Sequence, residues 1–412
     1  MRKVLVEKAV RLEKVPPYPL FDFNRVLKRL DKKGVEIIDL GRFDPALPLP
    51  GSVQKILPFL QDKKNFGYAE RVTIFKVKEL FSSWFNRRNG VLLNPKTEVF
   101  FYSGKRETLT QLALSFINPG DKTFVCEPAI QLYKGCALLA EGKIEVLPLL
   151  ERNDYLPNLG LLKNKHKDEG KFFFLNYPHN PTGSLADLFF YKELVEVALK
   201  NNIRVVQDAS YNEIYFEEFQ SYGSPFGSIL DNFGPPSLMQ AEGGKRVGVE
   251  LHSLSTGTGI PGIDCGFIVG DKEMISGLES QSRLFSRQPN HLLLKLAEVL
   301  LEEYETIISK NKQEYKARRD VMTELLLSLG WRARKPKATP FFWAQIPGRY
   351  SSLGFCRMLL RKTGVIASPG IEYGGPGEGF IRLSLNQPEE KLKEAGERIR
   401  EHSHFWQKRY RS

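Results

Sequence analysis

Cysteine is scarce in this sequence of 412 residues. The four cysteines stand far apart, without the paired spacing of zinc ligands: they are Cys126, Cys136, Cys265 and Cys356. Their number and spacing argue against a metal site and indicate a reducing compartment, the cytoplasm.

Long apolar runs are also absent. No uncharged apolar run approaches the roughly 20 residues that a membrane-spanning helix needs. Charges interrupt residues 1–23 every few positions, so this stretch contains no apolar signal core. The sequence therefore predicts no membrane contact.

Charges of one sign are not segregated along the chain. The 60 lysines and arginines exceed the 48 acids and give a formal net charge of +12, which would suit nucleic-acid binding. However, the cations are interspersed with acids, and only the short stretch 407–412 clusters them. We expect a solvated basic surface, or a ligand that carries phosphate or carboxylate, and no nucleic-acid partner.

Short apolar runs alternate with helical patterns between about residues 98 and 270. Seven runs are predicted to be strands: 98–104, 123–128, 144–149, 171–177, 203–211, 246–255 and 263–270. Helical periodicity is clearest over 105–121 and 186–202. This alternation predicts an α/β fold with a mostly parallel sheet covered by helices, and ligands beyond the carboxyl ends of its strands.

The pattern changes beyond residue 286. A long helical pattern covers 290–330, and short strands at 341–347, 364–370 and 379–385 precede a terminal helix from Glu389. We therefore predict three regions: an N-terminal arm that joins the small domain (1–50), a large domain (51–286) and a small α+β domain (287–412).

The stretch Gly257–Gly262 has the G-x-G-x-x-G spacing of a dinucleotide-binding turn. Such a turn must open a helix, whereas residues 263–270 are predicted to form a strand and leave no room for one. The spacing therefore does not indicate a nucleotide site.

Seven segments in order resemble the pyridoxal-phosphate (PLP) aminotransferases of class I/II, whose fold is fold type I. They are 37–45, 103–121, 174–184 ("FLNYPHNPTGS"), 203–217, 252–270, 365–374 and 377–385 ("GEGFIRLSL"). The resemblance covers most of the chain and implies a homodimer with PLP as cofactor. Fold alone does not establish activity, so each site position must be considered separately.

Four residues match family positions that contact cofactor or substrate. The resemblance implies that Asn180 and Tyr211 bind the phenolic oxygen of PLP and that Asp208 pairs with its ring nitrogen. It also implies that Arg382 binds the substrate carboxylate. A simpler interpretation remains open for each residue. Asn180 is then a turn residue, Tyr211 a packed aromatic, Asp208 a helix cap and Arg382 one half of an internal ion pair.

Further positions match the surroundings of the cofactor phosphate: Ser253, Gly104, Lys105, Arg106 and, from the partner chain of the dimer, Tyr68. Lys105 stands where the family has a small Ser or Thr. It either meets a phosphate at a helix N-terminus or is a solvated lysine. Tyr68 has aromatic packing as an equal alternative.

Two substitutions bear directly on catalysis. Thr256 stands where the family has the lysine that bonds the cofactor and carries the proton, and a threonine hydroxyl does neither. Asp264 stands where the family has the arginine that neutralises the phosphate. Other positions depart from the family pattern as well: Phe43, Thr73, Lys78 and Ile130.

The binding free energies lost through these departures indicate how well the cofactor should bind. Losing a charge-assisted phosphate contact costs about 1.5–3 kcal/mol, and losing ring stacking costs about 0.5–1.5 kcal/mol. We therefore predict weak PLP binding and a catalytically degenerate homologue that uses the old cleft or the dimer surface to bind a small anionic or amino-acid-like ligand.

Two alternatives stay open. The first is a PLP- or PMP-dependent aminotransferase in which Lys105 or His252 acts in place of the lysine, PMP being the amine form of the cofactor. The second is an interaction protein that uses the basic C-terminal tail.

Overall fold

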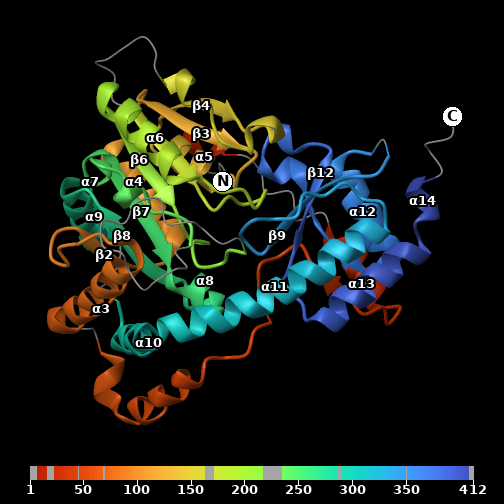
Figure 1. The fold of residues 1–412 in the computed structure, drawn as a ribbon, viewed down its shortest axis with the longest axis horizontal. Helices are drawn as coiled ribbons and strands as arrows, with labels where there is room; N and C mark the ends of the chain where they lie inside the picture. Colours follow the sequence, from red (N-terminus) through yellow and green to blue (C-terminus); the bar gives the residue numbers. More distant parts are fainter. Residues whose placement is uncertain are drawn as a thin grey trace, which may run out of the picture.

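The computed structural model of the chain describes residues 7–15, 23–44, 46–67, 70–162, 171–216, 234–285, 289–348 and 350–407. Figure 1 shows a large sheet with its helices beside a smaller group of strands and helices. One long helix, α11 (Tyr304–Ser328), runs from the first group to the second.

Seven strands of the described chain form the large sheet, in the order β2-β8-β7-β6-β5-β3-β4. They are β2 Val99–Ser103, β3 Lys122–Glu127, β4 Lys143–Pro148, β5 Lys171–Asn176, β6 Ile203–Asp208, β7 Gly248–Ser253 and β8 Cys265–Gly270. Strand β8 is antiparallel to β2 and β7, and the other pairs are parallel. All seven predicted runs contain a strand, and the predicted mostly parallel α/β sheet is confirmed.

Helices cover both faces of this sheet. One face carries α4 Lys105–Phe116, α5 Leu132–Leu139 and α9 Lys272–Phe285. The other carries α3 Arg71–Asn89, α6 Leu188–Lys200 and α10 His291–Glu302. Phe173 and Phe174 of β5 are buried in different clusters, one on each face. Two-sided burial explains the continuous apolar run of this strand, and each such ring contributes about 1.5–3 kcal/mol.

The smaller group combines the start and the end of the chain. Strands β11 Ser368–Pro369, β12 Phe380–Ser384 and β9 Phe341–Gln345 form an antiparallel sheet, and β1 Ile38–Asp39 pairs in parallel with β10 Val365–Ile366. The helices here are α2 Asn24–Asp31, α12 Ser352–Thr363, α13 Glu389–Glu401 and α14 His404–Gln407. The short helices α1 Val10–Glu13, α7 Gly244–Val247 and α8 Leu254–Thr258 complete the described α-helices, and short 3-10 helices lie between the elements.

The helical pattern over 290–330 is two helices rather than one. Helix α10 ends at Glu302, Glu303 leaves the helical conformation with φ −114° and ψ 14°, and α11 begins at Tyr304. The break lets α10 pack on α3 while α11 continues toward α13. Within the described ranges, no helix is both long enough and apolar enough to cross a membrane.

Candidate active site

Asp208 is the centre of the site, at the carboxyl end of β6. Its side chain is completely buried and accepts four hydrogen bonds. The donors are Lys105 Nζ (2.8 Å) and Tyr133 OH (2.7 Å) to Oδ2, and Ser210 N (3.0 Å) and Ser210 Oγ (2.5 Å) to Oδ1. Burial by itself would raise the pKa of Asp208, but the Lys105 charge and these hydrogen bonds outweigh it and hold the pKa below its ordinary value.

Lys105 reaches this carboxylate from the first position of α4. Gly104, at the N-cap with φ +94°, turns the chain from β2 into α4. The ammonium also contacts Ser210 Oγ at 3.0 Å, and the side chain is 18% exposed. Burial would lower the pKa of Lys105, but Asp208 raises it above its ordinary value, so both partners are charged. The expectation of a solvated lysine is therefore wrong.

Asn180 and Tyr211 lie together as the sequence predicts. Asn180 Nδ2 donates to Tyr211 OH at 3.3 Å, and Asn180 N donates to Asn176 Oδ1 at 3.0 Å. Asn176 also donates to the Asp208 carbonyl at 2.7 Å, so it ties the ends of β5 and β6 together. Tyr211 stacks edge-on with Phe43, at 5.9 Å between ring centroids.

Arg382 of β12 brings a buried cation to the same group. Its NH1 donates to Asn180 Oδ1 at 3.2 Å, its NH2 donates to the Gly41 carbonyl at 2.5 Å, and its guanidinium lies 4.1 Å from the Phe341 ring centroid. In the described part of the chain its buried Nε has no hydrogen-bond partner. No carboxylate of that part lies in direct contact with the guanidinium, which can therefore still bind a substrate carboxylate.

Glu372 is the acid whose charge acts on Arg382. Its Oε1 is buried without a hydrogen-bond partner. Burial raises the pKa of Glu372 to about 7, although the Arg382 charge lowers it. This carboxyl group therefore changes its charge near neutral pH.

Residues 253–264 form a short helix and a turn. Ser253 caps α8 by accepting the Thr256 N–H at 3.1 Å, and Thr256 lies on this helix, half-buried. Asp264, with φ +33°, meets the N-terminus of α4: its carbonyl accepts Gly104 N–H at 2.7 Å and its Oδ1 accepts Lys105 N–H at 3.3 Å. Strand β8 follows directly, as predicted, so no helix opens from the glycine turn.

The remaining predicted residues are Arg106, Tyr68 and His252, and the two that the structure describes donate no hydrogen bond to Asp208. Arg106 is exposed on the first turn of α4, and Tyr68 lies outside the described residues. His252 hydrogen-bonds Glu250 at 2.7 Å, and its ring packs 5.3 Å from the Phe85 ring, in the aromatic cluster under α3. His252 therefore does not reach the Asp208 group, and Lys105 does.

Three residues of the site escaped the sequence analysis: Asn176, Tyr133 and Ser210. Ser210 had a usable signal, because it lies two positions after Asp208 in the same motif. Tyr133 had none, since 75 residues separate it from the carboxylate that it contacts.

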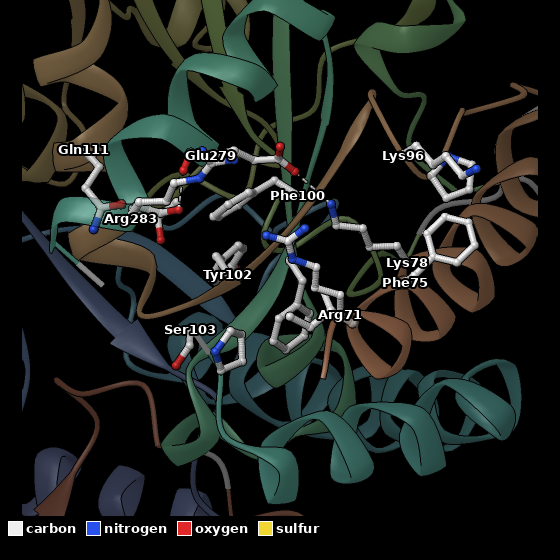
Figure 2. Close-up of a pocket in the computed structure, with 16 residues that line it drawn as sticks. Arg71, Phe75, Lys78, Lys96, Phe100, Tyr102, Ser103, Gln111, Glu279 and Arg283 are labelled. Atoms are coloured by element: carbon white, nitrogen blue, oxygen red, sulfur yellow. Dashed lines mark hydrogen bonds and ion pairs between the residues drawn. The ribbon is translucent and has the colours of Figure 1, made fainter. Parts of the chain in front are cut away.

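A cavity of about 670 Å³ (Figure 2) is lined in part by Tyr102, Ser103 and Thr108, which flank the turn from β2 into α4. It opens between α3, β2 and α9, and its charged lining residues are Arg71, Lys78, Lys96, Glu279 and Arg283. Lys78 and Glu279 form an ion pair at 3.1 Å across it. None of the predicted site residues that the structure describes lines this cavity. In those same residues, no group of three or more His, Cys, Asp or Glu side chains could hold a metal ion.

The fold and site together define a class. The fold-type-I aminotransferase architecture combines a mostly parallel seven-stranded sheet, a buried acid at its carboxyl edge, and an Asn–Tyr pair beside the sheet that an arginine from a second group of strands contacts. The chain belongs to the aminotransferase class I and II family, which residues 35–399 match.

Curated relatives agree over nearly the whole length. The chain is 34% identical to an LL-diaminopimelate aminotransferase of Halothermothrix orenii, over 96% of this chain and 98% of that protein. It is 35% identical to an LL-diaminopimelate aminotransferase of Dehalococcoides mccartyi, over 93% and 95%.

Solved structures resemble it as well. The structure of BacF from Bacillus subtilis without ligand superposes with a TM-score of 0.87, at 30% identity over 97% of this chain and 99% of that one. A probable N-succinyldiaminopimelate aminotransferase from Thermus thermophilus gives 0.82, at 28% identity over 93% and 99%.

These relatives overturn the prediction of a catalytically degenerate homologue. Proteins similar over more than nine tenths of the chain are named as aminotransferases. The prediction assumed that an amine must come from the position of Thr256. In the folded chain Lys105 brings an amine into the site from the start of α4 instead. The expectation of weak cofactor binding rested on the lost phosphate contact and the lost ring stacking, and it has no support from the relatives.

Proposed function

We propose that this protein is an amino acid aminotransferase that uses PLP or PMP and in which Lys105 is the amine of the site. The observation that carries the proposal is the Lys105–Asp208 contact of 2.8 Å inside the group formed with Asn180, Tyr211 and Arg382. This group brings together the amine of Lys105, the acid Asp208 and the guanidinium of Arg382, which is free to bind a substrate carboxylate.

The donors and acceptors of the site fit the ring of PLP. Asp208 would hold the ring nitrogen, Asn180 and Tyr211 the phenolic oxygen, and the N-terminus of α4 at Gly104 and Arg106 the phosphate. The buried Nε of Arg382, which has no partner within the described residues, fits a substrate carboxylate. When bound, PLP supplies an electron sink for the substrate carbon from which a proton is removed.

Lys105 has the properties of a proton carrier whose basicity depends on its partner. The Asp208 charge raises the pKa of Lys105, and burial acts in the opposite direction. When another cation takes Asp208, the contribution of Asp208 that raises the pKa of Lys105 is lost, which favours the neutral amine that a general base needs.

The relatives suggest the substrate class. They are named for LL-diaminopimelate, an amino acid with two carboxylates and two amino groups. We propose an amino donor of this kind, with Arg382 binding the carboxylate next to the reacting carbon. The net charge of +12 suits a substrate with more than one carboxylate.

The test measures amino transfer and the position of the amine. Purified protein is given PLP, LL-diaminopimelate and a 2-oxo acid, and amino-acid product is measured. A second sample with PLP alone is reduced with borohydride and mapped by mass. We expect product and a PLP adduct on Lys105, while Lys105→Met loses both.

Lys245→Met is the matched control. Lys245 forms a similar lysine–carboxylate pair with Glu98 at 3.0 Å, near the amino end of β7 and away from the site. This variant should keep product and adduct. Absence of product with LL-diaminopimelate and with a panel of amino acids would falsify the proposed activity, and an adduct on another lysine would remove Lys105 from this role.

Three further features belong to the same proposal. We propose a homodimer, in which Tyr68 of one chain serves the phosphate site of the other, and a cytoplasmic location. We also propose domain boundaries near residues 50 and 286. Size-exclusion chromatography with light scattering tests the first of these.

A further inference from the structure

Lys105 is bonded to two acids at once. Its ammonium donates to Asp208 Oδ2 at 2.8 Å, and its backbone N–H donates to Asp264 Oδ1 at 3.3 Å. Asp264 is held in place by a second contact, because its carbonyl accepts Gly104 N–H at 2.7 Å. The chain thus places one of its own cations at the buried acid and one of its own anions at the start of α4.

These two positions are where the charges of the cofactor would lie. A protonated ring nitrogen is a cation that Asp208 would receive, and a phosphate is an anion suited to a helix N-terminus. Oδ2 of Asp208 already accepts from Lys105 and Tyr133, and Oδ1 accepts twice from Ser210. A ring N–H must therefore displace one of these donors.

Lys105 is the donor that can leave. Tyr133 is buried at 3% exposure, and Ser210 is fixed by its position in the chain next to Asp208. The Lys105 side chain is 18% exposed and starts at the first position of α4, beside the exposed Ser103, Arg106 and Glu107. Rotation of its side chain alone carries the ammonium away from Asp208 without disturbing the helix.

We propose that Lys105 and Asp264 form an internal latch that competes with the cofactor and so sets how tightly it binds. The latch rests on the proposed function, because it concerns the same cofactor site. In this mechanism the ring nitrogen replaces the Lys105 ammonium on Asp208. The phosphate would take the place of the Asp264 carboxylate at α4, and Lys105 would be released from Asp208.

PMP is the probe that isolates this competition. It carries the ring nitrogen and the phosphate but no aldehyde, so it forms no covalent bond with a lysine. Equilibrium dialysis and the fluorescence of bound PMP measure its affinity without any turnover. We expect Lys105→Met to bind PMP at least tenfold more tightly than the unchanged protein, and Asp264→Asn to bind it severalfold more tightly.

Controls separate the latch from a merely structural contact. Lys245→Met should bind PMP as the unchanged protein does, and Asp208→Asn should bind it more weakly. Without PMP, Lys105→Met should unfold at a lower temperature, because Asp208 keeps a buried charge without its partner, and PMP should recover the loss. If Lys105→Met does not fold, the Asp264→Asn measurement decides alone.

The two ideas can fail separately. Equal or weaker PMP binding by both latch variants overturns the latch, even if the unchanged protein transfers amino groups. Tighter PMP binding by these variants supports the latch, even if the unchanged protein shows neither amino transfer nor a Lys105 adduct. The second result would overturn the proposed activity alone.

Discussion

Burial and pairing decide which side chains of the site carry charge. Asp208 is completely buried yet remains a carboxylate, because Lys105 and three other donors surround it. Glu372 is partly buried, its Oε1 is buried without a hydrogen-bond partner, and burial raises its pKa to about 7. Two acids of one site therefore behave differently, since one has a cation in direct contact and the other has not.

Glu372 should make stability depend on pH. The unfolded chain releases this proton near the ordinary value of 4.5, and the folded chain releases it near 7. Between these values the folded state binds more protons, so stability falls as pH rises. We expect Glu372→Gln to be more stable at pH 8 by about 1–2 kcal/mol, a reduced figure because the side chain is not fully buried.

Urea unfolding at pH 5 and pH 8 measures this effect. The difference between the two pH values should shrink in Glu372→Gln and stay unchanged in Glu242→Gln, which alters an exposed acid. A Glu372→Gln protein with the pH dependence of the unchanged chain would show that this carboxyl group ionises at its ordinary pKa.

Among the elements, α8 depends on a close approach to α11. A Cβ added to Gly257 would lie 2.1 Å from the hydroxyl of Tyr304, a buried ring at the start of α11. Asn311 of α11 also donates to the Gly257 carbonyl at 3.0 Å. The glycine turn noticed in the sequence therefore serves packing between two helices.

Two glycine substitutions test this packing. Alanine favours a helix over glycine by about 1 kcal/mol, but the overlap with Tyr304 should reverse the sign at Gly257. We expect Gly257→Ala to lose about 1–3 kcal/mol of stability. At Gly262 an added Cβ would meet no atom within 4 Å. Gly262→Ala should therefore change the free energy of unfolding by less than about 0.5 kcal/mol. Thermal unfolding of the pair measures the difference, and equal melting temperatures would contradict the packing argument.

Most elements of the large sheet could be predicted because their signals are local. An apolar run such as 171–177 or a periodic run such as 186–202 identifies a strand or a helix from neighbouring residues alone. The order of the strands could not be predicted in this way, since it depends on pairings between distant segments. The break at Glu303 was missed because the helical spacing of buried apolar residues, Leu301, Tyr304 and Ile307, continues across it.

The site shows the same division. Asn180, Asp208, Tyr211 and Arg382 were found from motifs, and the structure brings them together. The direction of the Lys105 side chain could not be found, because its partner lies 103 residues further along the chain. The sequence left open whether Lys105 enters the site, and the wrong prediction of a degenerate protein gave more weight to Thr256 and Asp264.

Across the whole molecule, Arg382 links the two groups of elements. From β12 in the smaller group it donates to Asn180 beside the large sheet, and to Gly41 near β1. A substrate carboxylate bound by Arg382 would therefore contact both groups. Substrate binding and the placement of the smaller group should depend on one guanidinium.

Arg382→Lys tests this role. Lysine keeps the charge but loses the planar, two-pronged geometry. A charge-assisted hydrogen bond contributes about 1.5–3 kcal/mol, so we expect KM for the amino donor to rise about 10- to 100-fold. Steady-state kinetics with the proposed donor measure it. Arg361→Lys, an exposed substitution on α12, should leave KM unchanged, and an unaltered KM in Arg382→Lys would rule out the carboxylate contact.

The pairing of β1 with β10 has a consequence for folding during synthesis on the ribosome. Ile38 is paired with Val365, and Asp39 with Ile366. At a synthesis rate of roughly 5–20 residues per second, the N-terminal strand waits about 15–65 s for its partner to be made. The large sheet, complete by Gly270, can assemble during this interval. Ile38 and Asp39 are thus among the last residues of the described strands to pair.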